Sequence, residues 1–243
     1  MKTITSVNNS YIKELSLLKN KKNRIDANKY IVEGYHLVEE AYKSGCLLQV
    51  LTTNENISFN IDTIIVTDAI IAKLSSTKEP QGIIGIVEMK EEAWCLFSKY
   101  LILDDISDPG NLGTIIRSSA ALGIDAIIVS LDTVDIYNDK VLRATQGAIY
   151  KIPIYRRNIK DAILELKQNN ITILTTALKK SVDLTTIDKP EKFAVVLGNE
   201  ARGVKEEYIN LADQVVRINM QNDVESLNVA MASGIITYYI LNK

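Results

Sequence analysis

The stretch Tyr100-Leu-Ile-Leu-Asp-Asp-Ile-Ser-Asp-Pro-Gly-Asn-Leu-Gly-Thr-Ile-Ile-Arg117 decides the fold of this chain. A short apolar run at Tyr100–Leu103 predicts a buried strand, and the apolar spacing over Thr114–Leu122 predicts a helix. Between them, Pro109 and Gly110 favour a turn, and Asn111 is suited to cap the helix through its side-chain oxygen. The stretch therefore predicts a strand, a polar loop and a helix.

Two later segments repeat this arrangement, each placed where a predicted strand ends. They are Val196-Leu-Gly-Asn-Glu-Ala-Arg-Gly203 and Ile218-Asn-Met-Gln-Asn-Asp-Val-Glu-Ser-Leu-Asn228. Within the second, Ser226 or Asp223 is expected to cap the last helix. Ligands bind at the carboxyl ends of strands in open α/β sheets, so the three loops are predicted to converge on one pocket.

Predicted strands and helices alternate from Tyr100 to the end of the chain. The strands are Tyr100–Leu103, Ala126–Val129, Ile171–Thr175, Phe193–Leu197 and Gln214–Ile218. The helices are Thr114–Leu122, Asn138–Gly147, Ile159–Gln168, Lys205–Leu211 and, approximately, Ser226–Leu241. Strands that are apolar on both faces and joined by helices indicate a doubly wound α/β domain with a parallel sheet covered on both sides.

Residues 1 to about 90 read as a smaller α/β unit. Its predicted helices and strands are Tyr11–Leu18, Gly34–Ser44, Leu48–Thr52, Thr63–Thr67 and Gly82–Glu88. The charged stretch at 90–92 and the segment Ala93–Ser98 look like the joint between two domains. We therefore expect one domain at 1–92 and a second at 98–243.

The composition excludes several classes of protein. With 243 residues and 47% hydrophobic content, the chain can bury a substantial core, which argues against disorder. It has no apolar run near the roughly 20 residues of a membrane span and no signal-peptide pattern, so we expect a cytoplasmic protein. Cys46 and Cys95 are far apart and are expected to be buried thiols, and with His36 as the one histidine we expect no metal.

The charge is unevenly distributed. A net charge of −2 argues mildly against nucleic-acid binding, but the segment Lys13–Lys29 is locally basic, as is a second group around Arg143 and Arg156. Either group alone is more often a solvated face. Together with transferase-like loops they favour RNA as the partner, with candidate RNA contacts at Lys19, Lys21, Lys22, Arg24 and Arg143.

The three loops also carry a family resemblance. In order, Asn111 with Arg117, then Gly198-Asn-Glu200, then Ser226-Leu-Asn228 resemble the three motifs of the SpoU/TrmH family of the SPOUT superfamily, the S-adenosylmethionine-dependent RNA ribose 2′-O-methyltransferases. The resemblance covers about 98–243. More loosely, residues 31–40 are similar to the family's L30e-like substrate-binding domain, the form found in bacterial enzymes that act on 23S rRNA.

This resemblance implies an activity, a topology and a set of site residues. It implies a homodimer with S-adenosylmethionine as cofactor and a carboxyl-terminal trefoil knot involving the loops around Gly198 and Ile218 and the last helix. The implied catalytic residues are Asn111, Arg117, Glu200, Ser226 and Asn228. The implied cofactor contacts are Thr176, Leu197, Gly198, Ile218, Met220 and Leu227. Because arginine stays protonated, Arg117 is assigned to charge stabilisation and positioning, with direct proton removal left open.

Two positions depart from the family pattern. The family usually has glycine where this chain has Ala201 and proline where it has Asn219. The loss of proline frees φ, so cofactor affinity is the property in question.

Other interpretations remain open. Taken alone, Gly198-Asn-Glu200 is typical of a turn, and the last helix is typical of a buried core helix. The chain could act on tRNA, could be a non-catalytic RNA-binding paralogue, or could be an α/β enzyme that acts on a small molecule. Methyl transfer to RNA separates these: the paralogue would retain RNA without transfer, and the small-molecule enzyme would turn over without RNA. The absence of Gly-x-Gly-x-x-Gly and Gly-Lys-Ser/Thr patterns argues against dinucleotide and phosphate-loop sites.

Overall fold

The computed structural model describes residues 2–57, 59–90, 92–222 and 224–242, and the chain divides into two compact units. One consists of 1–91 together with 137–150, and the other of 92–136 together with 151–243. The domain limits expected from the sequence, 1–92 and 98–243, stay a prediction.

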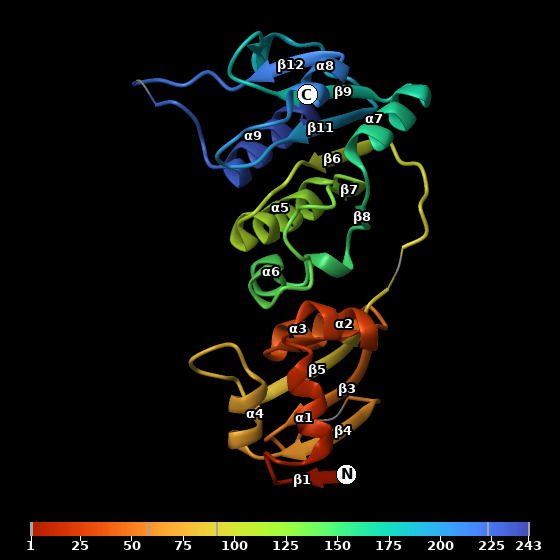
Figure 1. The fold of residues 1–243 in the computed structure, drawn as a ribbon, viewed down its shortest axis with the longest axis vertical. Helices are drawn as coiled ribbons and strands as arrows, with labels where there is room; N and C mark the ends of the chain where they lie inside the picture. The colour runs from red at the N-terminus through yellow and green to blue at the C-terminus, as the bar shows by residue number, and fades with distance from the viewer. Residues whose placement is uncertain (1, 58, 91, 223, 243) are drawn as a thin grey trace. The chain divides into compact units, whose positions relative to one another are not determined.

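The first unit is built on a mixed five-stranded sheet (Figure 1). Its strands, in the order β1-β4-β3-β5-β2, are β1 Lys2–Ile4, β4 Asp62–Val66, β3 Leu47–Thr52, β5 Ile83–Glu88 and β2 Lys29–Glu33. Its helices are α1 Ser10–Leu17, α2 Lys21–Ala27, α3 Tyr35–Lys43, α4 Asp68–Leu74, α6 Asp139–Thr145 and the 3-10 turn Ala148–Tyr150. The predicted helices and strands are present, whereas α2, α4, β1 and β2 were missed because their apolar patterns are short.

The second unit is a parallel seven-stranded sheet, which confirms the doubly wound prediction. Its strands, in the order β10-β12-β9-β11-β6-β7-β8, are β10 Val182–Asp183, β12 Gln214–Arg217, β9 Thr172–Thr176, β11 Phe193–Leu197, β6 Lys99–Leu103, β7 Ala126–Val129 and β8 Ile154–Arg156. Its helices are α5 Pro109–Leu122, α7 Ile159–Gln168, α8 Glu206–Leu211, α9 Val229–Leu241 and the 3-10 turn Leu184–Thr186. Strands β8 and β10 were not predicted, because both are very short edge strands.

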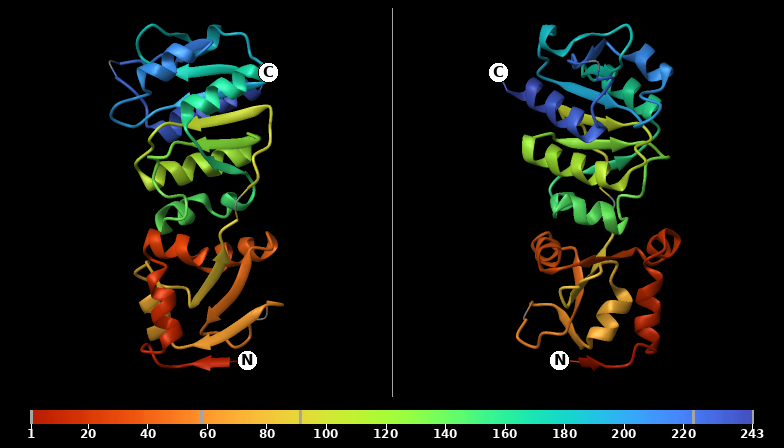
Figure 2. Two further views of the ribbon diagram at one scale, coloured as in Figure 1. Left: turned by 45° about the vertical axis from the view of Figure 1, so that its right-hand side comes forward. Right: turned by 90° about the vertical axis from the view of Figure 1, so that its left-hand side faces the viewer.

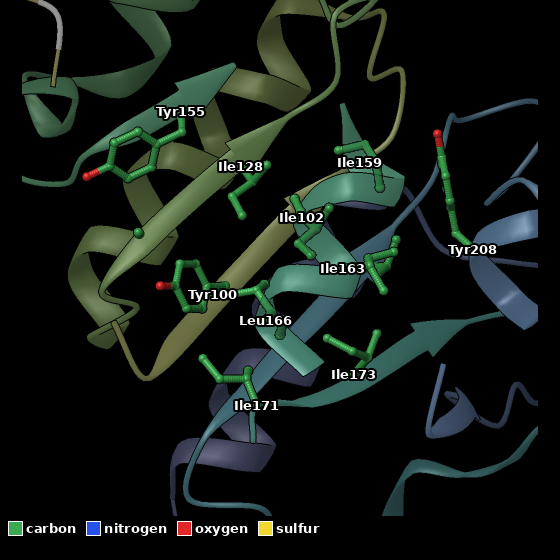
Figure 3. Close-up of a cluster of buried hydrophobic side chains, with 14 of the residues drawn as sticks. Tyr100, Ile102, Ile128, Tyr155, Ile159, Ile163, Leu166, Ile171, Ile173 and Tyr208 are labelled. Carbon is green, nitrogen blue, oxygen red and sulfur yellow. The ribbon is translucent and has the colours of Figure 1, made fainter. Parts of the chain in front are cut away.

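Helices cover both faces of this sheet. On one face α7 and α8 pack on the strands through a continuous apolar cluster in which Ile163 and Leu166 meet Tyr100 and Ile173 (Figure 3). On the other face α5 and α9 lie side by side (Figure 2). With both faces covered, the carboxyl edge of the strands is where polar loops can emerge.

The segment expected to be a joint packs on the second unit. Trp94 and Phe97 lie against the α7 face of the core, and Trp94 Nε1 donates a 2.6 Å hydrogen bond to Glu165 Oε1. The guanidinium of Arg157 lies 4.2 Å from the Trp94 ring centroid. Cys95 is exposed, so the prediction of two buried thiols was wrong for Cys95. An apolar segment with charged partners thus continues the core instead of forming a free linker.

The structure bears on membrane crossing but does not test the knot. Among the described residues, no helix is long and apolar enough to cross a membrane. The trefoil knot stays a prediction.

Candidate active site

The loops after β6, β9, β11 and β12 leave the sheet at one edge, because these strands are parallel and adjacent. The three segments singled out from the sequence follow β6, β11 and β12. They therefore lie at the carboxyl edge of a single sheet, as expected, while their convergence on one pocket stays a prediction.

The first segment starts α5 earlier than expected. Asp108 is the N-cap, and its Oδ1 accepts a 2.7 Å hydrogen bond from the backbone nitrogen of Asn111. Pro109 occupies the first turn, where its fixed φ and missing N–H are favourable. The predicted turn at Pro109 and Gly110 and the predicted cap at Asn111 were wrong. Asn111 lies inside the first helical turn, and its side chain bonds to other loops.

The second segment forms a tight loop after β11. Asn199 and Gly203 pair as an antiparallel bridge, with N···O distances of 3.2 and 2.9 Å. A Cβ at Gly198 would lie 2.1 Å from the carbonyl carbon of Gly203, so the crossing of the chain over itself requires glycine at this position. Ala201 has no left-handed φ, and its backbone nitrogen donates a 2.9 Å hydrogen bond to Asn199 Oδ1. The loop therefore accommodates alanine at position 201 without strain.

Glu200 projects from this loop to the start of α5. Its Oε1 accepts from Asp108 N at 3.3 Å and Asn111 Nδ2 at 3.0 Å, and its Oε2 accepts from Ser107 N at 3.3 Å and Ser107 Oγ at 3.0 Å. Burial raises the pKa of Glu200, but the hydrogen bonds from Asn111, Ser107 and Asp108 outweigh it and lower the pKa below its usual 4.5. A carboxylate with its acceptor sites occupied is a poor proton acceptor and a firm anchor.

The hydrogen bonds continue from Glu200 into the third segment. Asn111 Oδ1 accepts a 2.9 Å hydrogen bond from Asn228 Nδ2, and Asn228 Oδ1 accepts from the backbone nitrogens of Ala230 at 2.9 Å and Met231 at 3.4 Å. We call Glu200, Asn111 and Asn228 the amide relay. Because a carboxylate only accepts, it turns Asn111 Nδ2 towards itself and so leaves Asn111 Oδ1 to accept from Asn228. The charge on Glu200 thus fixes the orientation of both amides.

The start of α9 differs from the expected one. The helix begins at Val229, and Asn228 is its N-cap. The prediction of Ser226 as cap was wrong, because Asn228 occupies that position, and Asp223 lies outside the described residues. Ser226 is exposed in the segment before the helix.

Arg117 lies apart from the relay on the same helix as Asn111. Its side chain is exposed and makes no hydrogen bond or ion pair with any residue that the structure describes. A planar guanidinium in this state can bind a phosphate or a developing oxyanion without first breaking an internal contact.

Four of the predicted cofactor contacts lie at the ends of adjacent strands, while Met220 and Leu227 lie in the segment between β12 and α9. Thr176 ends β9, Leu197 ends β11 and Ile218 follows β12, with Thr176 Oγ1 donating to Val196 O at 3.2 Å. Ile218, Met220 and Leu227 are half-buried. Gly198 lies at the same edge, but the close approach of the Gly203 backbone is enough to explain why glycine stands there.

These residues fit an adenosine-bearing ligand. Between Glu225 and Asn228 no backbone nitrogen donates a hydrogen bond to a described residue, so these amides are available to an external acceptor. Half-buried apolar side chains beside these backbone nitrogens suit a heterocycle with polar edges. In contrast, the described residues contain no group of three or more His, Cys, Asp or Glu side chains placed to hold a metal ion.

The predicted RNA contacts all lie in the first unit and fall into two groups. Lys21 and Lys22 are exposed at the start of α2. Lys19 Nζ donates to the carbonyls of Lys73 at 2.9 Å and Ser75 at 2.8 Å.

Two of the predicted arginines have internal partners. Arg24 is only 7% exposed, and its Nη1 donates to Leu18 O at 2.9 Å and Lys19 O at 3.0 Å. Arg143 pairs with Asp139 at 2.8 Å. A buried guanidinium that holds a helix–helix turn offers little surface to a phosphate, so we withdraw Arg24 from the RNA surface.

Sequence reasoning missed several residues that build the edge. Ser107 and Asp108 hold Glu200, and the carbonyl of Asp105 accepts from Asn199 Nδ2 at 2.8 Å. The Asp-Pro pair at 108–109 is a recognisable helix start and could have identified Asp108. Nothing in the sequence indicates that the carbonyl of Asp105 is the acceptor.

Comparison with known families covers both parts of the chain. Residues 98–238 match the SpoU rRNA Methylase family, and residues 9–85 match the MRM3-like substrate binding domain. The 23S rRNA (guanosine(2553)-2′-O)-methyltransferase RlmP of Bacillus subtilis is 35% identical over 246 aligned residues, which cover 99% of each chain.

Solved structures are similar over nearly the whole chain. An rRNA methyltransferase from Sinorhizobium meliloti, in a crystal structure with bound AdoMet, has a TM-score of 0.88 and 29% identity, covering 98% of this chain and 97% of that one. An RNA 2′-O ribose methyltransferase has a TM-score of 0.85 and 26% identity, covering 98% of both.

Proposed function

The chain belongs to the SpoU rRNA methylase family, and we propose that it 2′-O-methylates one ribose of the large-subunit ribosomal RNA with S-adenosylmethionine as methyl donor. The reaction class and the cofactor follow from the family and from its AdoMet-bound structural neighbour. The Bacillus relative, matched along its whole length, supports 23S rRNA as the substrate class. The observation that carries the proposal is the amide relay, which joins all three family motifs in one hydrogen-bonded chain.

Different residues of the chain have different roles in the reaction. S-adenosylmethionine supplies an electrophilic methyl group. The amide relay holds the first turn of α5 and the start of α9 in fixed relation, so that a ribose hydroxyl is presented in one orientation. Arg117 stabilises the negative charge that develops on the ribose oxygen and its neighbouring phosphate. Glu200 stays ionised and positions Asn111, because its acceptor sites are already used.

RNA affinity is assigned to the first unit. Lys21 and Lys22 are exposed cations on a short helix, and Lys19 keeps the α1–α2 turn in place through Lys73 and Ser75. Phosphate contacts of this kind add affinity without base specificity. With ribosomal RNA as the substrate, the cytoplasm is the proposed location.

A homodimer through the second unit is also proposed. On α9 the apolar side chains of Met231, Ile235 and Tyr238 are 58%, 39% and 60% exposed. Their spacing places them on one helical face, and an exposed apolar face is typical of an interface. Light scattering at micromolar concentration should report twice the 27.1 kDa of the chain, and a monomer would contradict the dimer.

The decisive experiment maps ribose methylation in the cell. Large-subunit RNA from a strain that lacks the gene should lose one 2′-O-methyl group that its parent has, and the purified protein should restore it in vitro with S-adenosylmethionine. Retention of RNA and cofactor with no transfer to any RNA would favour the non-catalytic interpretation. Transfer to tRNA alone would redirect the substrate assignment.

A further inference from the structure

The loop after β9 and the segment after β12 are tied together by side chains. Arg217 Nη1 donates to the carbonyl of Ser181, and Arg217 Nε donates to Asn219 Oδ1 at 2.9 Å. Asn219 Nδ2 donates in turn to Asp183 Oδ2. Because β10 and β12 are parallel with Asp183 opposite Arg217, the ladder itself brings these side chains together.

Asp183 sets the direction of these hydrogen bonds. Its Oδ1 accepts from Thr185 N at 2.8 Å and Thr185 Oγ1 at 2.7 Å, so Oδ2 is left for Asn219. Hydrogen bonds from Thr185, and then from Asn219, lower the pKa of the Asp183 carboxyl. An ionised carboxylate only accepts, which turns Asn219 Nδ2 towards Asp183 and Asn219 Oδ1 towards Arg217.

The position of Asn219 connects these bonds to the candidate cofactor loop. Asn219 is exposed, whereas Ile218 and Met220 on either side of it are half-buried. Proline would fix φ at this position through its ring, whereas asparagine leaves φ free to vary. Two side-chain hydrogen bonds of Asn219 therefore restrain the backbone between two half-buried apolar residues.

We propose that Asp183, Asn219 and Arg217 form a clasp that positions the segment 218–222 for S-adenosylmethionine. The clasp rests on the proposed function, since it assigns Ile218 and Met220 to that cofactor. Its members are positioning residues: they act through the backbone of the segment and not by contact with the reacting atoms. They set cofactor affinity and leave the chemical step to the amide relay and Arg117.

Reversing the polarity of one hydrogen bond tests the clasp. Asn219→Asp places a carboxylate against that of Asp183, and loss of a hydrogen bond to a charged group with added repulsion should raise the cofactor Kd about tenfold. The double variant Asp183→Asn with Asn219→Asp restores one donor and one acceptor in exchanged places. The new amide at position 183 still accepts from Thr185, because asparagine caps as well as aspartate. The Kd should return to within about twofold of the wild type, since the number of hydrogen bonds is the same.

The readouts separate positioning from folding. Calorimetry with S-adenosylmethionine gives the Kd, and single-turnover transfer at saturating cofactor gives the chemical rate, which should be unchanged in Asn219→Asp. Asp188→Asn is the matched control, because Asp188 is exposed on the same loop after β9 as Asp183 and makes no hydrogen bond or ion pair with a described residue.

Each result decides between the two proposals. If the wild type binds cofactor and Asn219→Asp binds equally well, or if the double variant does not recover, the clasp is overturned while the proposed function stands. If the wild type binds no S-adenosylmethionine, the proposed function fails and the clasp fails with it.

Discussion

The amide relay and the clasp are built differently, although both join loops at one edge of the same sheet. In the relay, Glu200 accepts from four donors, and the chain of amides ends on the N-terminus of α9. In the clasp, the exposed Asn219 and the half-buried Asp183 and Arg217 hold a segment that leads to residues 225–228, whose backbone nitrogens donate to no described residue. The difference teaches that the relay makes its hydrogen bonds within the chain, whereas we propose that the backbone nitrogens of 225–228 find their acceptor in a ligand.

This division matches what methyl transfer requires. The chemical step depends on a fixed geometry around the ribose, and a preorganised hydrogen-bond network supplies that geometry. The cofactor must enter and leave in every cycle, so its half of the site works best with a lower local stability. Substitutions in the two halves should therefore change different kinetic quantities.

The largest effect is expected outside both networks, at Arg117. Arg117→Ala should reduce single-turnover methyl transfer on the order of 10²–10³-fold, because it removes a charge that acts mainly in the transition state. Cofactor Kd and melting temperature should stay unchanged, since Arg117 has no bond to a described residue. Arg117→Lys is the control: it keeps the charge and loses the planar fork, so partial activity is expected. A near-wild-type rate for Arg117→Ala would break the comparison, because methyl transfer would then not depend on the Arg117 guanidinium.

A smaller but still large effect is expected from Glu200→Gln. The amide puts a donor where the relay needs an acceptor, and loss of hydrogen bonds to a charged group should cost about 1–3 kcal/mol, or roughly ten- to a hundredfold in transfer rate. Cofactor Kd should change little, in contrast to Asn219→Asp.

The pH dependence sharpens the same point. The pKa of Glu200 is lowered in the folded chain, so the stability it contributes is present above the unfolded value and is lost only as pH falls through the folded value, below 4.5. Transfer rates measured from about pH 5 to 9 should therefore show no step from Glu200. A rate that falls with a midpoint inside this range in the wild type and not in Glu200→Gln would make Glu200 a proton acceptor.

The smallest effect is expected in the first unit, where exposed lysines again contrast with a buried, hydrogen-bonded arginine. Replacing Lys21 and Lys22 by Ala should weaken RNA binding several-fold and reduce the slope of log K against log salt by roughly 1.5, because two phosphate contacts are lost. Arg24→Ala should instead lower the melting temperature, since Arg24 is buried and bonded to Leu18 and Lys19. An unchanged salt slope for the double lysine variant would place the RNA surface elsewhere.

Much of the fold could be predicted, because continuous apolar runs such as Phe193–Leu197 have few alternatives to a buried parallel strand. Helix starts were less predictable. Asp108 and Asn111 are both good caps, and only the folded backbone shows that Pro109 opens α5 and leaves Asn111 to the relay.

The sequence could group three of the expected site residues but could not show how they are connected, and their catalytic roles stay predictions. The order of the motifs led to Glu200, Asn111 and Asn228, but their mutual hydrogen bonds depend on how β6, β11 and α9 pack. Burial of Arg24 was also hidden, because a basic segment is normally solvated and nothing local shows that two carbonyls converge on one guanidinium. The hydrogen bond between Asp183 and Asn219 could not be predicted either, because the two-residue strand β10 is too short to show a sequence pattern.

Between Glu225 and Asn228 the backbone nitrogens donate to no described residue, which makes them a probe that hydrogen exchange can follow. Amide hydrogens without an acceptor exchange with deuterated solvent almost as fast as in an unstructured peptide, whereas those of the neighbouring α9 are protected. A ligand that accepts hydrogen bonds from this segment would slow the exchange at a few adjacent amides, against a background that is fast in the free chain. Mass spectrometry of one peptide could then time the arrival and departure of the cofactor without a label on either molecule.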